Sequence, residues 1–240
     1  NFDALLELQL RRDELADMIV HDMRSPLAAL LCQTEVLLEE LEDPEHLEDM
    51  RLIRDAGLRL NSFANDLLIT AKMSSGSLEL DRRLVDVDAM CRKVYRQHLP
   101  VAKQRGVSFE LDAPGEGATS VLDEGLCCRL LDNLLSNAFK FAPRGTLLRL
   151  EVSTDERGLR LRVRDQGPGV PESKRSAIFL KYRGEDAADS AGSSIGLGLT
   201  FSRLVCEAHG GSIAVEENPG GGALFSAFLA SGKVSERPSF

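Results

Sequence analysis

The sequence predicts a protein of two parts, an all-α helical hairpin that forms a dimeric four-helix bundle, followed by an α+β sandwich. Up to Met73, apolar side chains recur at three- and four-residue spacing, which is typical of packed helices. Beyond a break that contains serine and glycine, short alternating apolar stretches typical of strands are mixed with helical ones. A chain of 240 residues also has room for two domains.

The first part reads as two long helices joined by a short connection. Apolar residues mark one helix face between residues 15 and 41, and "EDPEH" then interrupts the pattern. Asp43 is the expected N-cap of the next helix, with Pro44 at its first position. A second apolar stripe runs over residues 47–68. Because two antiparallel helices cannot bury stripes of this length, we expect a second copy to complete a four-helix bundle.

The second part is expected to place helices on one side of a mostly antiparallel sheet. The segment "KMSSGSLELDRRL" breaks the helical period and reads as a linker. The expected helices cover residues 86–105, 124–142 and 197–209, and the expected strands 107–111, 119–122, 146–154, 159–165, 212–217 and 223–229. The expected organisation is therefore a hairpin over 1–74, a linker over 75–85, the sandwich over 86–231 and a tail over 232–240.

Composition and charge exclude several classes of function. A net charge of -9 argues against nucleic-acid binding, which needs clustered basic residues. The chain has no run of about 18 apolar residues, the length that a membrane-spanning helix requires. It begins at Asn1 inside a helical pattern, so we expect a piece of a longer protein, with any membrane contact made only through segments upstream.

The five cysteines favour a reducing compartment. Their number is odd, no CxxC occurs, and no histidine stands at metal-ligand spacing from them. We expect them to pack as small apolar side chains, while redox sensing through one of them stays open.

His21 is followed by an acid and a proline in the stretch "DMIVHDMRSPLAALL". On a helical wheel it shares its face with polar or small residues, so we expect its imidazole to face water. Asp22 could accept the Nδ1 proton and leave Nε2 as a nucleophile. Pro26 has no N–H to bond the carbonyl of Asp22, so the helix is expected to bend there. A solvated surface histidine and a tolerated kink are the simpler alternatives.

A second group of polar residues lies on one face of the expected helix 124–142. Asn133, Asn137 and Lys140 stand at i, i+4 and i+7 in "LLDNLLSNAFKFAP", while Leu130, Leu131, Leu134, Leu135, Ala138 and Phe141 form the apolar remainder. Two amides and an ammonium suit a magnesium ion and phosphates, since an amide oxygen can bind Mg²⁺. An ordinary polar helix face is the alternative.

Two glycine-containing segments support a nucleotide pocket. Asp165 ends an alternating strand and is followed by Gly167 and Gly169, so its carboxylate could accept a hydrogen bond from an adenine amino group. Further along, "GSSIGLGL" leads into a helix whose N-terminus would offer N–H groups to phosphates. The polar stretch "RGEDAADSAGSS" between them reads as a lid, or as a disordered loop.

Taken in order, these segments resemble a sensor histidine kinase of two-component signalling. "VHDMRSPLAAL" resembles the H box of that family, "NLLSNAFKFAP" its N box, "DQGPGV" its first glycine box, "IFLKYR" its F box and "SSIGLGL" its second glycine box. The closing segment "NPGGGALFSAFL" is also similar, and the resemblance runs from about residue 10 to 230. It implies a dimerisation and phosphotransfer hairpin followed by the Bergerat-type ATP-binding domain shared with gyrase, Hsp90 and MutL.

The resemblance also implies roles for individual residues. His21 is the implied phosphoacceptor, Asp22 its general base or orienting acid, and Ser25 stands where the family has Thr or Asn for phosphatase activity. Asn137 would hold Mg²⁺, with Asn133 and Lys140 at metal or phosphates. The remaining ATP-site residues are Asp165 for adenine, with Gly167, Gly169, Tyr182, Gly196, Leu197 and Gly198 shaping the pocket and lid. Phe179 matches an F-box aromatic, and His209 a residue that serves structure.

The implied function is an ATP-dependent protein histidine kinase that passes its phosphoryl group to an aspartate of a response regulator. Related ATPases carry a water-activating glutamate where this chain has Asn133, which is no base at neutral pH. We therefore expect poor ATP hydrolysis and transfer to His21. The F box is one residue short, and "GSSIGLGL" lacks one glycine often seen in the family.

Two alternatives stand beside this function, a different enzyme on the same fold and a protein of another class. One is an ATPase or serine kinase on the same fold, which Asn133 and the His21 helix disfavour. The other is a nucleotide-binding dimeric scaffold, or pseudokinase, without phosphotransfer. The implied location is the cytoplasm, with any anchor of the full-length protein in the inner membrane.

Overall fold

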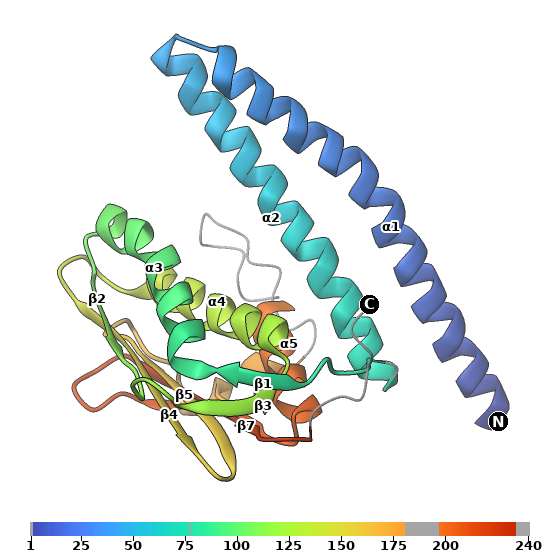
Figure 1. Ribbon diagram of the computed structural model, residues 1–240, viewed down its shortest axis with the longest axis vertical. Helices are drawn as coiled ribbons and strands as arrows, with labels where there is room; N and C mark the ends of the chain where they lie inside the picture. The colour runs from blue at the N-terminus through green and yellow to red at the C-terminus, as the bar shows by residue number, and fades with distance from the viewer. Residues whose placement is uncertain (1, 77, 181–196, 234–240) are drawn as a thin grey trace. The chain divides into compact units, whose positions relative to one another are not determined.

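The computed structural model describes residues 2–76, 78–180 and 197–233 and divides into two compact units (Figure 1). The first unit covers Asn1–Leu78 and the second Glu79–Phe240. Within the described residues, no helix is both long enough and apolar enough to cross a membrane.

The first unit is the helical hairpin. Helix α1 spans Phe2–Glu40 and helix α2 spans Pro44–Ser75. Asp43 caps α2 as the sequence predicts, because its Oδ1 accepts a 2.9 Å hydrogen bond from the Glu45 amide. Gly76 ends the helix in the left-handed conformation, with φ of 72°.

Close packing joins the two helices. A methyl group added at Gly57 of α2 would lie 2.9 Å from a Leu31 side-chain carbon of α1, so the glycine lets the helices approach. Nearer His21, the Arg24 Nη2 donates to Asn65 Oδ1 across the hairpin at 2.9 Å. Helix α1 continues through Pro26 without interruption.

The hairpin leaves many large apolar side chains exposed in a single copy. Leu27 is buried, as a seam residue should be, but Met18 is 53% exposed. The other exposed members in the hairpin are Leu30, Val36, Leu52, Ile53, Leu58 and Leu60. Apolar surface of this extent on a helical pair favours burial against another helical pair.

The net charge is distributed unevenly between the units. Residues 1–78 contain 16 acidic and 7 basic side chains, a difference of -9, whereas residues 79–240 contain 22 of each. The whole net charge of the chain therefore resides in the hairpin unit.

The second unit is built around a five-stranded sheet of order β2-β4-β5-β7-β6. Its strands are β2 (Ser108–Asp112), β4 (Leu147–Asp155), β5 (Gly158–Arg164), β6 (Ser212–Glu217) and β7 (Ala223–Ala230). Helices α3 (Val87–Arg105), α4 (Glu124–Phe141) and α5 (Leu197–Ala208) lie on one face of it (Figure 1). The apolar side chains of β5 alternate with arginines, so one face of the sheet is the core face.

Some elements differ from the sequence expectation. Strand β1 (Arg83–Asp86) begins in the expected linker and ends at the first residue of the expected sandwich. It pairs antiparallel with β3 (Thr119–Leu122) in a separate two-stranded sheet. In the main sheet, β2 runs parallel to β4 while the other three pairs are antiparallel. Two short 3₁₀ turns, η1 (Glu172–Lys174) and η2 (Ala177–Phe179), were also not expected.

The core of the second unit encloses three cysteines. Cys91, Cys127 and Cys206 are fully buried, Cys128 is half-buried, and Cys32 is exposed on α1. Burial raises the pKa of Cys91 and of Cys206 to about 12 and raises that of Cys127 well above its usual value. Since the thiolate is the reactive form, these buried thiols are inert packing groups.

We expect iodoacetamide at pH 8 to alkylate Cys32 in the folded protein and to leave the three buried cysteines unmodified. Mass spectrometry of tryptic peptides would measure the labelling, and labelling in urea would supply the control in which every thiol reacts. Alkylation of Cys127 in the folded protein at the rate of Cys32 would contradict the burial that the structure describes.

Candidate functional site

The first group of predicted site residues lies on helix α1. His21 belongs to this helix, although its side chain lies outside the described ones. Asp22 and Ser25 are exposed residues of the hairpin. An acid and a hydroxyl therefore stand within about one helical turn of the histidine.

The second group lies on helix α4. Asp123 caps the helix by accepting a 3.1 Å hydrogen bond from the Leu126 amide. Asn133, Asn137 and Lys140 are all half-buried on the polar face. The apolar face contains Leu130, Leu131, Leu134, Leu135 and Ala138, all buried. The sequence assignment of Phe141 to this apolar face is wrong, since its side chain is 52% exposed; the buried aromatic is Phe139.

Asp165 lies directly after β5 and is only 4% exposed. Its Oδ1 accepts hydrogen bonds from the amide of Gly167 at 2.8 Å and from the amide of Ala223 at 3.2 Å. Among the described residues, no donor reaches Oδ2. A buried carboxylate held by one oxygen thus has its other oxygen to offer to a ligand.

Close backbone approach explains the first glycine segment. A methyl group at Gly167 would lie 2.8 Å from the carbonyl oxygen of Phe141, the last residue of α4, and 3.0 Å from Asp165 Oδ1. Only a residue without Cβ lets the loop pass between the end of α4 and the carboxylate. The chain after β5 is therefore held against the helix that carries the amides.

Asn218 is a supporting residue that the sequence did not indicate. Its Nδ2 donates to the Asp165 carbonyl oxygen at 2.8 Å, and a methyl group at Gly222 would overlap that same oxygen. In the sequence, Asn218 begins the glycine-rich stretch "NPGGG" of the closing segment. Asn218 and Gly222 together fix the backbone from which the Asp165 side chain projects.

The second glycine segment meets the amide face of α4 at Gly198. A methyl group at Gly198 would lie 3.1 Å from Asn133 Oδ1, so the first turn of α5 packs directly against this amide. Leu197 is buried, and Gly169 has φ of 71° and sits beside Gly222. The predicted site residues Tyr182 and Gly196 lie outside the described residues, as does the predicted lid.

Phe179, which the sequence matched to an F-box aromatic, belongs to the turn η2. It is buried, and its ring lies 6.3 Å from that of Phe225 in an edge-to-face arrangement. The Arg203 Nε of α5 donates to its carbonyl oxygen at 3.2 Å. Phe179 therefore joins the turn η2 to both α5 and the sheet.

No metal cluster made of histidine, cysteine or carboxylate side chains is present among the described residues. Mg²⁺ does not require one, because it is commonly held by one or two protein oxygens together with substrate phosphates. The amide oxygens of Asn133 and Asn137 on the half-buried polar face of α4 suit that donor set.

His209 is a buried structural residue at the end of α5. Its Nδ1 lies 2.8 Å from the Val205 carbonyl oxygen, and its Nε2 accepts a 3.1 Å hydrogen bond from the Asp123 amide. One nitrogen donates and the other accepts, so the ring is neutral. Burial lowers the pKa of His209, and the nearby Arg82 cation acts in the same direction. The imidazole joins the end of α5 to the N-cap of α4.

Acid is expected to destabilise the protein through His209. Because its pKa in the folded state lies below the unfolded value of about 6.5, its stabilising contribution is present at neutral pH and is lost as the pH falls below 6.5. His209→Gln should lower the free energy of unfolding by about 1–3 kcal/mol at pH 7.5.

Urea denaturation at pH 7.5 and 5.5 would measure both effects. The variant should lose less stability between the two pH values than the native chain does. An equal loss in both proteins would show that other groups cause the acid sensitivity.

Comparisons with known proteins agree with this arrangement. Residues 11–76 match the family model described as "His Kinase A (phospho-acceptor) domain". Residues 122–232 match the model of the "Histidine kinase-, DNA gyrase B-, and HSP90-like ATPase". Together the two matches include the histidine of α1, the amides of α4 and the carboxylate after β5.

Individual relatives extend over nearly the whole chain. It is 29% identical over 231 residues to the sensor histidine kinase TmoS of Ectopseudomonas mendocina, and 31% identical over 234 residues to the sensor protein KdpD of Escherichia coli (strain K12). Each alignment covers 95% of this chain but only 24% and 25% of those proteins. The chain therefore spans about a quarter of the length of these relatives.

Among solved structures, full-length ShkA in complex with AMPPNP is similar with a TM-score of 0.70 and 29% sequence identity. The match covers 92% of this chain and 47% of ShkA. Helical hairpin and sandwich are therefore found in the same order in a nucleotide-bound protein.

Proposed function

The chain belongs to the histidine kinase family, and from that premise we propose that it is the autophosphorylating core of a sensor kinase, transferring the γ-phosphoryl group of ATP to His21. The hairpin of residues 1–74 would carry the acceptor, residues 75–85 the connection, and residues 86–231 the ATP site. The observation that carries the proposal is the meeting of three sequence segments in the second unit. There Gly167 packs between Asp165 and the end of α4. Gly198 at the start of α5 packs against Asn133 of α4.

The arrangement supports ATP binding through separate contacts. Asp165 would accept from the adenine amino group through Oδ2, since Oδ1 is occupied by two amides. Asn133 and Lys140 would reach the phosphates from α4, and the first turn of α5 would direct its unsatisfied N–H groups at them. These contacts position the nucleotide, which is most of what phosphoryl transfer requires.

Asn137 would hold a Mg²⁺ ion through its amide oxygen. The ion would neutralise phosphate charge when ATP is bound. Asn133 lies beside Gly198 and offers only an amide, which cannot deprotonate water at neutral pH. The site would therefore bind ATP without hydrolysing it efficiently.

His21 would be the nucleophile. Its neutral Nε2 would attack the γ-phosphorus, the bond from that phosphorus to the bridging oxygen of ADP would break, and ADP would leave. Asp22 would accept the proton that Nδ1 gives up or orient the ring. A phosphohistidine results, and its phosphoryl group could pass to an aspartate carboxylate of a response regulator.

The exposed apolar residues of the hairpin support a homodimer built as a four-helix bundle. The response regulator would dock on this bundle near the exposed Ser25, whose hydroxyl could also orient water for dephosphorylation of the regulator. The use of ATP and the free cysteines fit a cytoplasmic location, with any membrane anchor carried by other segments of the protein.

Incubation of the purified chain with γ-labelled ATP and Mg²⁺ tests the proposal. Label that is lost in acid but retained in alkali identifies phosphohistidine. Binding of ATP without any such label would support the scaffold alternative.

A further inference from the structure

The outer face of the five-stranded sheet carries a row of arginines along its central strand. Helices cover the other face (Figure 1). On β5 Arg160 and Arg162 are exposed, while Leu161 between them is buried. Arg164 is half-buried on the same outer face, and Arg149 lies directly opposite it on β4. Residues two apart on a strand lie about 7 Å apart, so β5 presents three like charges in a row.

Two of these four arginines are neutralised by carboxylates. Arg149 Nη2 lies 2.7 Å from Glu110 Oε2 of β2, and Arg164 Nε lies 2.6 Å from Glu151 Oε1 of β4. Each of these pairs ties neighbouring strands together, so both arginines have a structural role.

The other two arginines are not neutralised in this way. Arg160 lies over the Phe228 ring, with its guanidinium carbon 5.4 Å from the ring centroid. The Arg162 side chain forms no hydrogen bond or ion pair with any other described residue. The Asp112 side chain at the end of β2 forms none either, although its charge, after that of Glu110, helps to raise the pKa of Arg149. Two cations and one anion on this face are therefore available to a ligand.

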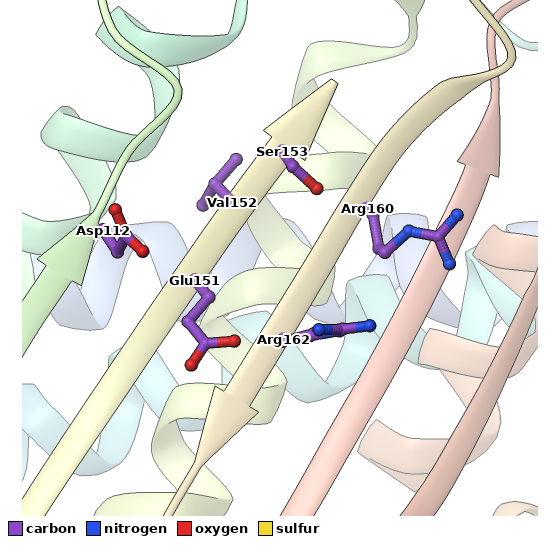
Figure 2. Close-up of a pocket in the computed structure, with 6 residues that line it drawn as sticks. All are labelled: Asp112, Glu151, Val152, Ser153, Arg160 and Arg162. Carbon is purple, nitrogen blue, oxygen red and sulfur yellow. The ribbon is translucent and has the colours of Figure 1, made fainter. Parts of the chain in front are cut away.

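A shallow pocket brings these free charges together. It is lined by Asp112, Glu151, Val152, Ser153, Arg160 and Arg162. Figure 2 shows the Arg160 and Arg162 side chains reaching from β5 toward β7, while Asp112 and Glu151 lie on the opposite side. Because Glu151 is paired with Arg164, the pocket has the Asp112 carboxylate at one side and, at the other, two guanidiniums that form no ion pair with a described carboxylate.

The shape and charge pattern indicate the class of ligand. Sites for small molecules are concave and bury most of the ligand, whereas this pocket lies open on a sheet face. A uniformly anionic partner, such as an acidic membrane or a nucleic acid, would be repelled by Asp112. A protein segment with an acidic and a basic group can satisfy both sides.

We propose that this face, centred on Arg160, Arg162 and Asp112, is a docking surface for a protein segment that carries acidic and basic side chains. The acidic group would pair with the two guanidiniums and the basic group with Asp112. The two sides are separated by two strand spacings, roughly 10 Å, which an extended peptide covers in about three residues. The proposal stands apart from the kinase activity, since no residue of this surface belongs to the ATP site.

The test uses the side-chain Nε resonances of arginine in the intact chain, measured by NMR. The probe is the peptide Lys-Ser-Ser-Glu-Glu with blocked ends, and its control replaces lysine by glutamine. We expect the lysine peptide to shift the Arg160 and Arg162 signals saturably and to leave the Arg149 signal in place. The glutamine peptide should bind about fivefold more weakly, the value of one exposed ion pair.

Variants distinguish this surface from general charge attraction. The double variant Arg160→Gln/Arg162→Gln should lose peptide binding, whereas Arg149→Gln, which removes a paired arginine from the same face, should retain it. Both variants should fold and autophosphorylate as the native chain does. A failure of the docking proposal can therefore be distinguished from a failure of the kinase proposal. Absence of a shift, equal binding of both peptides, or tighter binding of phosphatidylglycerol vesicles than of the peptide would overturn the proposal.

Discussion

His21→Gln is expected to reduce acid-labile phosphorylation of the chain to background while leaving ATP binding unchanged. Glutamine keeps a polar side chain on α1 but supplies no nucleophilic ring nitrogen, so the phosphoryl group has no acceptor. The histidine and the ATP site belong to different units, so the nucleotide contacts are not altered. Incorporation of γ-labelled phosphate, followed by acid and alkali treatment, measures the effect.

A second histidine provides the control for this variant. His46→Gln changes another exposed histidine of the hairpin, in the first turn of α2, and should leave the labelling intact. Acid-labile label that persisted on His21→Gln would mean that a different residue is the acceptor.

Asp165→Asn is expected to weaken nucleotide binding by roughly 10- to 150-fold, the value of one hydrogen bond to a charged group. The variant should still fold, because an amide oxygen can accept from Gly167 and Ala223 as Oδ1 does now. Its NH₂ group, however, would replace Oδ2 and cannot accept from an adenine amino group. Isothermal titration with AMPPNP and Mg²⁺ measures the loss.

Glu156→Gln is a matched control for Asp165→Asn. It also removes one carboxylate from the second unit, but in the exposed turn between β4 and β5. It should bind AMPPNP with native affinity. If Asp165→Asn bound as tightly as this control, the assignment of Asp165 to adenine would fail.

Much of the fold was predictable because each main element has a strong local signal. The N-cap at Asp43 followed from one acid before a proline, and β5 followed from its strict alternation of apolar residues and arginines. Strand β1 was missed because its four residues contain only one buried side chain, so no alternation is visible. Its pairing with β3 depends on contacts between segments far apart in the chain.

In the candidate site, the sequence indicated only those residues whose side-chain type itself suggests that they bind a ligand. Asp165 and the amides of α4 were predicted to bind a ligand because a carboxylate after a strand and two amides on one helix face are typical of ligand sites, and this assignment stays a prediction. Asn218 was missed because its role is a hydrogen bond to a backbone carbonyl, and the stretch "NPGGG" does not show which carbonyl its side chain reaches. The exposure of Phe141 was also missed. A helical pattern alone does not show at which residue the end of α4 stops packing against the rest of the unit.

The unequal distribution of charge between the units has a consequence for assembly. In the homodimer that we propose, two hairpins that each carry a net charge of -9 come into contact, so they repel one another. At physiological ionic strength the screening length is about 8 Å, and it grows as salt is removed. The apolar contact must therefore overcome a repulsion that increases as the salt concentration falls. The affinity of the dimer is expected to decrease with decreasing ionic strength.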